Sequence, residues 1–157
     1  MPDIRALRRG SGSDSPLGGR GGGQGGIEGE PISLDSPDPK FSEYLQRVKQ
    51  KIMANWGFPC VKDQVTKECA YKNAVLIIEF GILKDGRVQF VELRRSSGRG
   101  LEIYDDYALN AIKLSSPFPE IPRDIMLALN SKKSTTGMPI VAHFTYSVET
   151  SVRNLLR

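Results

Sequence analysis

The sequence predicts an α+β domain, in which a three-stranded antiparallel sheet carries two helices on one face, preceded by a disordered Gly-rich tail. Two observations support this class. Apolar residues recur at helical spacing over residues 41–56 and 103–114 and alternate at strand spacing over residues 75–83 and 140–148. In addition, ten of the sixteen glycines lie between Gly10 and Gly29. The expected order of elements is helix, hairpin, helix, strand.

Residues 1–38 are expected to form a flexible linker, and residues 39–157 the folded domain. The Gly-rich stretch has almost no apolar side chains, so it cannot offset the entropy lost on ordering. Pro31, Pro37 and Pro39 stiffen the approach to the domain.

The first helix is expected to begin at Asp38-Pro39, which supply an N-cap oxygen and a proline suited to the first turn. Gly57 and Pro59 end it. Its apolar residues share one face, which we interpret as core packing rather than a ligand site: Phe41, Tyr44, Leu45, Val48, Ile52 and Trp56.

A β-hairpin is expected next. Residues 75–83 alternate with period two, Lys84-Asp85-Gly86-Arg87 has the Asp-Gly pair of a tight turn, and the second strand follows over residues 88–95. The apolar residues of that second strand do not keep one parity, which predicts a bulge soon after the turn. Ser96-Ser97-Gly98 ends the strand.

A second helix is predicted over residues 103–114, and its alanines allow close packing against the sheet. Three prolines then force residues 115–122 into an extended path, with Phe118 and Ile121 as plugs at the domain edge. Residues 125–130 suit a short helix or a short strand equally, and residues 132–137 are a polar loop.

The last strand follows Pro139 and alternates apolar and mostly polar side chains, which is typical of a sheet with one buried face. Its inward residues are Ile140, Ala142, Phe144, Tyr146 and Val148, and its outward residues are Val141, His143, Thr145 and Ser147.

Composition and motifs argue against several function classes. The net charge of +4 is modest and no Arg/Lys run accompanies it, so nucleic-acid binding is not expected. The single histidine, His143, has no nucleophile motif beside it, and we read Asp105-Asp106 as first-turn charges that favour the helix dipole. One His and two Cys fall short of a zinc site, and the Gly-rich tract lacks the Lys-Ser/Thr of a phosphate loop. We therefore expect no enzyme, no cofactor and no metal.

Five motifs in order resemble the TonB/TolA C-terminal domain family. "FSEYLQRVKQKIMANWGFP" (residues 41–59) is similar to the opening helix of TolA-like members, and "VLIIEFGILKDGRVQFVELRRSSG" (residues 75–98) to the family's core hairpin. "YDDYALNAI" (residues 104–112), "SSPFPEIP" (residues 115–122) and "VAHFTYSV" (residues 141–148) resemble its acid-then-alanine helix, Pro-rich connector and final strand. The chain departs from the family in its Gly-rich spacer, in a longer loop over residues 123–138 and in a tail beyond residue 148.

This resemblance implies a periplasmic protein-binding domain of an energy transducer that couples an inner-membrane, proton-driven motor to outer-membrane transporters. The partner would be the N-terminal segment of a transporter, added as a strand to an open edge of the final strand, Ile140 to Val148. The alternative is a TolA-like role in envelope integrity and constriction, with a Tol-type periplasmic partner. A further alternative is that this strand is covered by the tail or by a homodimer.

The resemblance also implies that the full-length protein is tethered to the inner membrane, through a segment that precedes this chain. No run of about 20 apolar residues is present here to span a bilayer. No secretory signal is recognisable either.

Cys60 and Cys69 lie between the first helix and the first strand. In an oxidising periplasm a disulfide between them would close a small loop and contribute about 2–3 kcal/mol. Two reduced thiols in a flexible loop are the alternative.

Overall fold

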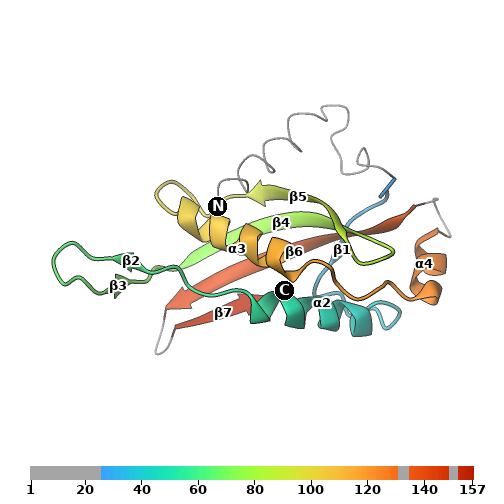
Figure 1. Ribbon diagram of the computed structural model, residues 1–157, viewed down its shortest axis with the longest axis horizontal. Helices are drawn as coiled ribbons and strands as arrows, with labels where there is room; N and C mark the ends of the chain where they lie inside the picture. The colour runs from blue at the N-terminus through green and yellow to red at the C-terminus, as the bar shows by residue number, and fades with distance from the viewer. Residues whose placement is uncertain (1–25, 131–134, 149–151) are drawn as a thin grey trace.

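The computed structural model describes residues 26–130, 135–148 and 152–157, and the expectations for residues 1–25 and 131–134 lie outside this range. The elements, shown in Figure 1, are β1 (Ile32–Ser33), α2 (Ser42–Ala54), β2 (Val61–Lys62), β3 (Cys69–Ala70), β4 (Ala74–Leu83), β5 (Val88–Arg95), α3 (Glu102–Ser115), α4 (Arg123–Asn130), β6 (Gly137–Val148) and β7 (Val152–Leu156). The α+β class is confirmed.

The main sheet has five strands, so the expectation of three was wrong. β4 lies between β5 and β6, and the far side of β6 pairs with both β1 and β7. β1 is parallel to β6, whereas all other pairs are antiparallel. The two additional strands escaped sequence reasoning because they are two and five residues long, too short to display a period.

The β4–β5 hairpin matches the sequence prediction closely. Gly86 has a φ of 99°, as the expected Asp-Gly turn requires. The register shifts between Gly81 and Ile82, next to the turn, which is the predicted bulge. A second shift follows between Ile77 and Ile78.

Helices α2 and α3 pack on the same face of the sheet. Their apolar stripes share one core cluster with the inward residues of the strands, for example Val48 of α2, Ala108 of α3 and Phe80 of β4. The ambiguous segment over residues 125–130 is helical, within α4. The Pro-rich connector donates backbone hydrogen bonds to the hairpin turn, and Phe118 and Ile121 are buried as expected.

The folded unit begins earlier than residue 39. Ile27 and Leu34, which the sequence analysis assigned to the linker, are 1% and 2% exposed. Ile27 lies over Gly81 and Gly137 on the face of the sheet opposite the helices. Residues 27–34 are therefore part of the domain, because they bury apolar surface that the sheet would otherwise leave in water.

The Ser-Ser-Gly motif after β5 is held by Asp105. This carboxylate is 1% exposed and accepts hydrogen bonds from Ser96 Oγ at 2.5 Å and from the Ser97 N–H at 2.8 Å. Asp105 thus has a more specific role than the dipole interaction that the sequence suggested. It fixes the start of α3 to the end of β5.

An aromatic cluster joins α3 and β6 to the segment that follows α2. The Trp56 ring packs edge-on against Tyr146, with 5.0 Å between centroids, and its Nε1–H donates to the Tyr146 hydroxyl at 2.7 Å. That hydroxyl in turn donates to the Tyr104 carbonyl at 2.9 Å. Burial raises the pKa of Tyr146, so its hydroxyl stays protonated as this chain of hydrogen bonds requires.

The early domain boundary predicts that Ile27→Ala lowers the free energy of unfolding by about 2–5 kcal/mol, the usual cost of truncating a buried isoleucine. Ile103→Ala is the matched control, since Ile103 is 37% exposed, and it should cost far less. Urea unfolding of both variants measures the difference. Equal, small changes in the free energy of unfolding for both variants would show that residue 27 belongs to the linker and not to the folded domain.

The aromatic cluster predicts that Tyr146→Phe destabilises the domain by about 1–3 kcal/mol, because the buried Trp56 N–H loses its acceptor. Tyr107→Phe removes the same atom from a side chain that is 38% exposed and should be nearly neutral. Thermal unfolding compares the two variants, and a neutral Tyr146→Phe would show that the Trp56 N–H finds another acceptor.

Candidate protein-binding edge of the sheet

The residues predicted to bind a partner form one continuous stretch of β6. Its inward side chains are fully buried at Ile140, Ala142 and Phe144, and Tyr146 is 1% exposed. The outward side chains, Val141, His143, Thr145 and Ser147, lie on the opposite face and are partly or fully exposed. Val148 ends the strand and is partly exposed. The predicted alternation is therefore correct.

The prediction of an open backbone edge on β6 is wrong. The N–H and the carbonyl of His143 both bond to Arg157, at 2.8 and 3.0 Å. By alternation along the strand, Thr145 and Ser147 face the same way, opposite Leu155 and Arg153 of β7. Farther along, the Leu34 N–H donates to the Val141 carbonyl at 2.9 Å.

The edge is thus occupied from within the chain, by β7 over Phe144 to Val148 and by β1 over Ile140 and Val141. The physical reason is that an unpaired strand edge attracts any extended segment within reach. The tail, which the sequence analysis named as one alternative cover for this strand, supplies such a segment.

β7 fits its place imperfectly. Leu156 is buried in the core at 3% exposure, but Leu155 remains 45% exposed. The side-chain Oδ1 of Asn154 is buried without a hydrogen-bond partner among the described residues. An unsatisfied buried acceptor costs about 1–3 kcal/mol, so β7 binds its neighbour less favourably than an ideal strand would.

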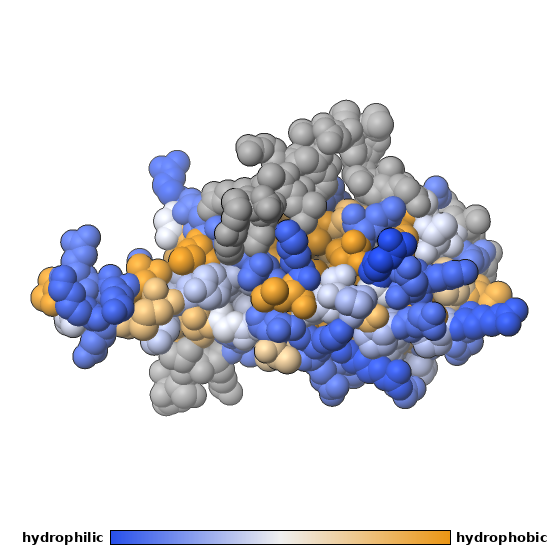
Figure 2. Space-filling view, viewed as in Figure 1, coloured by the Kyte–Doolittle hydropathy of each residue, from blue (hydrophilic) through white to orange (hydrophobic). Residues whose placement is uncertain are grey.

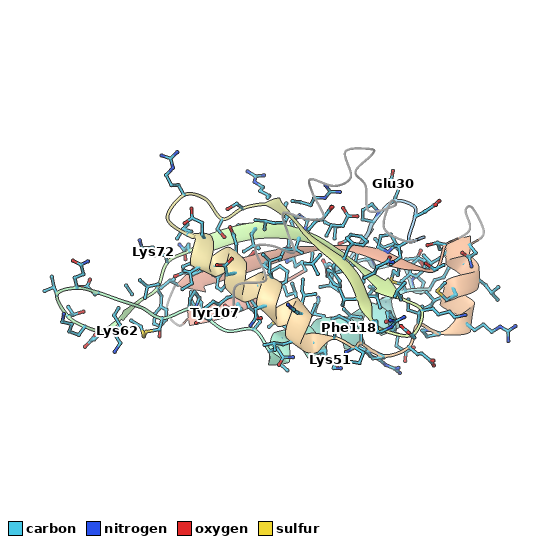
Figure 3. The ribbon with its side chains drawn as sticks, turned by 45° about the horizontal axis from the view of Figure 1, so that its top comes forward. Glu30, Lys51, Lys62, Lys72, Tyr107 and Phe118 are labelled. Carbon is cyan, nitrogen blue, oxygen red and sulfur yellow. A yellow bond between two sulfur atoms is a disulfide. The ribbon has the colours of Figure 1, made fainter. Side chains whose placement is uncertain are left out.

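A disulfide joins Cys60 and Cys69, whose Cα atoms are 4.8 Å apart. It closes the small hairpin of β2 and β3, in which Val61 pairs with Ala70 and Lys62 with Cys69. Figure 1 shows this hairpin extending away from the sheet and helices, and Figure 3 shows it with Lys62 on the projecting part and Lys72 near its base. We call residues 60–71 the arm. The sequence indicated a possible disulfide between these cysteines but not the hairpin, because the residues around them show no strand-like alternation of apolar and polar side chains.

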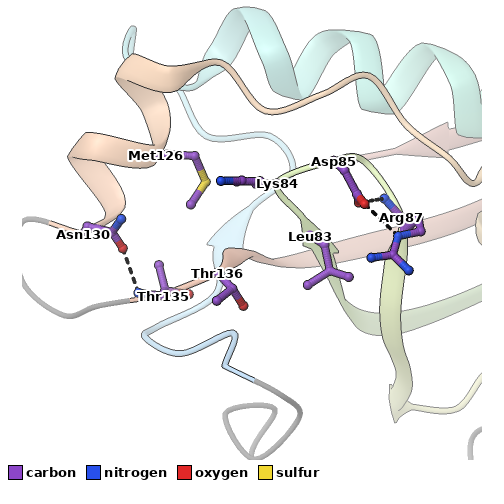
Figure 4. Close-up of a pocket in the computed structure, with 8 residues that line it drawn as sticks. All are labelled: Leu83, Lys84, Asp85, Arg87, Met126, Asn130, Thr135 and Thr136. Carbon is purple, nitrogen blue, oxygen red and sulfur yellow. Dashed lines mark hydrogen bonds and ion pairs between the residues drawn. The ribbon is translucent and has the colours of Figure 1, made fainter.

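A pocket of about 390 Å³ lies at the other end of the sheet, between the β4–β5 turn and α4 (Figure 4). Lys84 and Arg87 line it. The backbone N–H of Arg87 donates to the Asp85 carboxylate at 3.0 Å and the Arg87 guanidinium donates to it at 2.8 Å, and these two bonds lower the pKa of that carboxyl. Its other lining residues include Met126, Asn130 and Thr135. This composition offers no nucleophile paired with a base, so the pocket suggests no reaction.

Metal and membrane sites are also absent from the part of the chain that the structure describes. Over residues 26–130, 135–148 and 152–157, no group of three or more His, Cys, Asp or Glu side chains is placed to hold a metal ion. None of the described helices has the length and apolarity needed to cross a bilayer. On the face that Figure 2 shows, polar and apolar groups are interspersed.

Comparison with known proteins gives one family. Residues 41–129, more than half of the chain, match the family described as TonB C terminal. A solved structure with partial similarity is the solution NMR structure of TolAIII bound to a peptide derived from the N-terminus of TolB. That similarity has a TM-score of 0.43 and 18% identity, and it covers 67% of this chain and 73% of the other. The comparison with curated proteins gives no match. On the strength of the family match, this chain belongs to the TonB C terminal family, whose domains are periplasmic interaction domains.

Proposed function

We propose that this domain is the protein-binding end of an energy transducer that couples an inner-membrane, proton-driven motor to outer-membrane transporters. It takes up the extended N-terminal segment of a transporter as a strand alongside β6, in the place that β7 occupies in the free domain. The observation that supports this proposal is β7 itself, a terminal segment held on β6 by a regular antiparallel register.

β7 occupies the position on β6 that we propose for the partner strand. Its pairing means that the backbone of His143, Thr145 and Ser147 can accept an antiparallel strand without rearrangement of β6. The incoming segment would pair over Phe144 to Val148. Ile140 and Val141 would stay paired with β1, which anchors the N-terminal end of β6 during the exchange.

Exchange of one strand for another is nearly neutral in backbone hydrogen bonds, because each ladder bond that is lost is replaced. The balance is then decided by side chains. In β7, Leu155 stays exposed and the Asn154 amide oxygen has no hydrogen-bond partner within the part of the chain that the structure describes. A partner strand that buries its apolar residues more completely and leaves no polar atom unsatisfied would pair with β6 more favourably than β7 does. Against this, β7 is tethered, and short connections give effective concentrations on the order of millimolar. The bound state is therefore favoured only by a well-matched segment, which gives selectivity.

The second candidate is the TolA-like role, with a periplasmic Tol-type protein as partner. The opening helix favours it, because residues 41–59 resemble the first helix of TolA-like members. The binding edge would be the same. Only the partner's sequence separates the two, so both are tested by one assay. In either case the membrane anchor and motor contact belong to other parts of the full-length protein.

The exchange is tested by locking β7 in place. Thr145 and Leu155 face each other across β6 and β7 with their side chains on the outer face, and a hydrogen-bonded pair of this kind has Cα atoms about 5.5 Å apart, within disulfide range. The double variant Thr145→Cys/Leu155→Cys should, when oxidised, lose all amide shifts that a transporter N-terminal peptide induces in the wild-type domain. Reduction should restore them.

Wild-type domain under the same reducing conditions is the control, since the Cys60–Cys69 bond opens as well. Undiminished binding by the locked variant would mean that the peptide adds outside β7, and exchange would be wrong. A response of the wild type to a Tol-derived peptide alone would select the second candidate. No response to either peptide would contradict both.

A further inference from the structure

The arm projects from the domain with hardly any buried side chain of its own. All side chains from Cys60 to Glu68 are exposed, and Val65, near its end, is 86% exposed, the highest value among the large apolar residues described. Figure 2 shows the arm standing out from the body with an apolar patch at its end. Because this conformation buries almost no side chain, it depends on contacts other than core packing.

Three separate devices fix the arm instead. At its base, the Phe58 ring packs edge-on against Tyr71 and Tyr146, with centroids 5.3 and 5.1 Å apart, and the Lys72 N–H donates to the Tyr104 hydroxyl at 2.9 Å. In its middle, the Cys60–Cys69 disulfide joins the two strands.

The end of the arm is closed by Asp63. Its Oδ1 accepts hydrogen bonds from the N–H groups of Val65 and Thr66, at 2.7 and 3.1 Å. These bonds lower the pKa of the Asp63 carboxyl, so it stays ionised at neutral pH. Lys67 takes a φ of 65°, the only positive value among the non-glycine residues described. A residue in this left-handed conformation is a common way to close a short hairpin loop.

The chemistry of the arm favours a protein as its target. Around Val65, Lys62 and Lys67 are offset by Asp63 and Glu68, so the end has no net charge to attract nucleic acid or anionic lipid. An exposed valine on a pre-ordered loop loses little entropy on binding, which suits insertion into an apolar depression on a folded surface.

The arm also lies where the partner strand enters. Asn73, which connects the arm to β4, accepts a hydrogen bond from the Val148 N–H at 2.7 Å. Val152, the first residue of β7, pairs with that same Val148. A segment that replaces β7 therefore begins next to the base of the arm, and one partner can reach both places.

From this arrangement, and resting on the proposed strand exchange, we propose that the arm is a second contact site for the same partner protein. Val65 inserts into an apolar depression on the partner beside the segment that pairs with β6. The strand would supply the main-chain ladder, and the arm would distinguish the intact partner from any peptide that can form a strand.

The test uses the photo-crosslinking amino acid p-benzoylphenylalanine in the full-length transducer in living cells, placed at position 65, 145 or 43. Position 145 reports on strand pairing at β6. Position 43 is a matched control on α2, because the Glu43 side chain is also 86% exposed. We expect positions 65 and 145 to crosslink the same protein, identified by mass spectrometry, and position 43 not to crosslink it.

An adduct at position 145 without one at position 65 would overturn the arm proposal and leave strand exchange standing. Adducts at position 65 only with a second copy of this chain, or only with a different protein, would also overturn it. Absence of any adduct at position 145 would count against the proposed function instead.

Affinity measurements with the protein so identified make the test quantitative. Val65→Asp should weaken binding of that intact protein by about tenfold, the loss expected when one buried valine contact is removed, while binding of its isolated strand peptide stays unchanged. Gln64→Ala, at the neighbouring exposed position, should change neither. Equal loss of intact protein and peptide would mean that Val65→Asp acts through the fold.

Discussion

The structure depends on the need of β6 to pair on both sides. β6 is the longest strand described, and its inward side chains are the centre of the core, so it cannot leave the sheet. Its backbone groups at Val141, His143, Thr145 and Ser147 point away from β4 and require other partners. β1 and β7 meet this need from the two ends of the chain. The far edge of β6 is consequently covered from within the chain, by β1 and β7.

Under the proposed strand exchange, the imperfect fit of β7 has a purpose. A tail that matched β6 ideally would hold the edge permanently, whereas no tail would leave an aggregation-prone edge in the periplasm. The exposed Leu155 and the unsatisfied Asn154 amide oxygen would place the affinity of β7 for β6 between these extremes. The arm would add a second contact at the same end of the sheet. Strand and arm together would give a partner both a main-chain ladder and a shape-specific anchor.

The sequence predicted those parts whose order comes from a long hydrophobic period. The faces of α2 and α3, the β4–β5 hairpin with its bulge, and the alternation of β6 all follow from side-chain patterning. The sequence did not predict the segments that are held in place by other contacts. β1 and β7 are held by the neighbour they cover, Ile27 lies in a segment that reads as linker, and the arm is fixed by a disulfide and by Asp63. Such contacts are long-range or chemically specific, so no local pattern of apolar residues in the sequence predicts them. The edge of β6 was therefore placed correctly on the chain but wrongly described as open.

The most direct measurement is the nuclear Overhauser effect between the Hα protons of Tyr146 and Asn154. These residues form a non-hydrogen-bonded pair across β6 and β7, in which the two Cα atoms approach to about 4.5 Å. We expect a strong cross-peak in the free domain, and its replacement by an intermolecular cross-peak from Tyr146 when a transporter N-terminal peptide saturates the domain. Persistence of the Tyr146–Asn154 cross-peak in the saturated complex would contradict the proposed strand exchange.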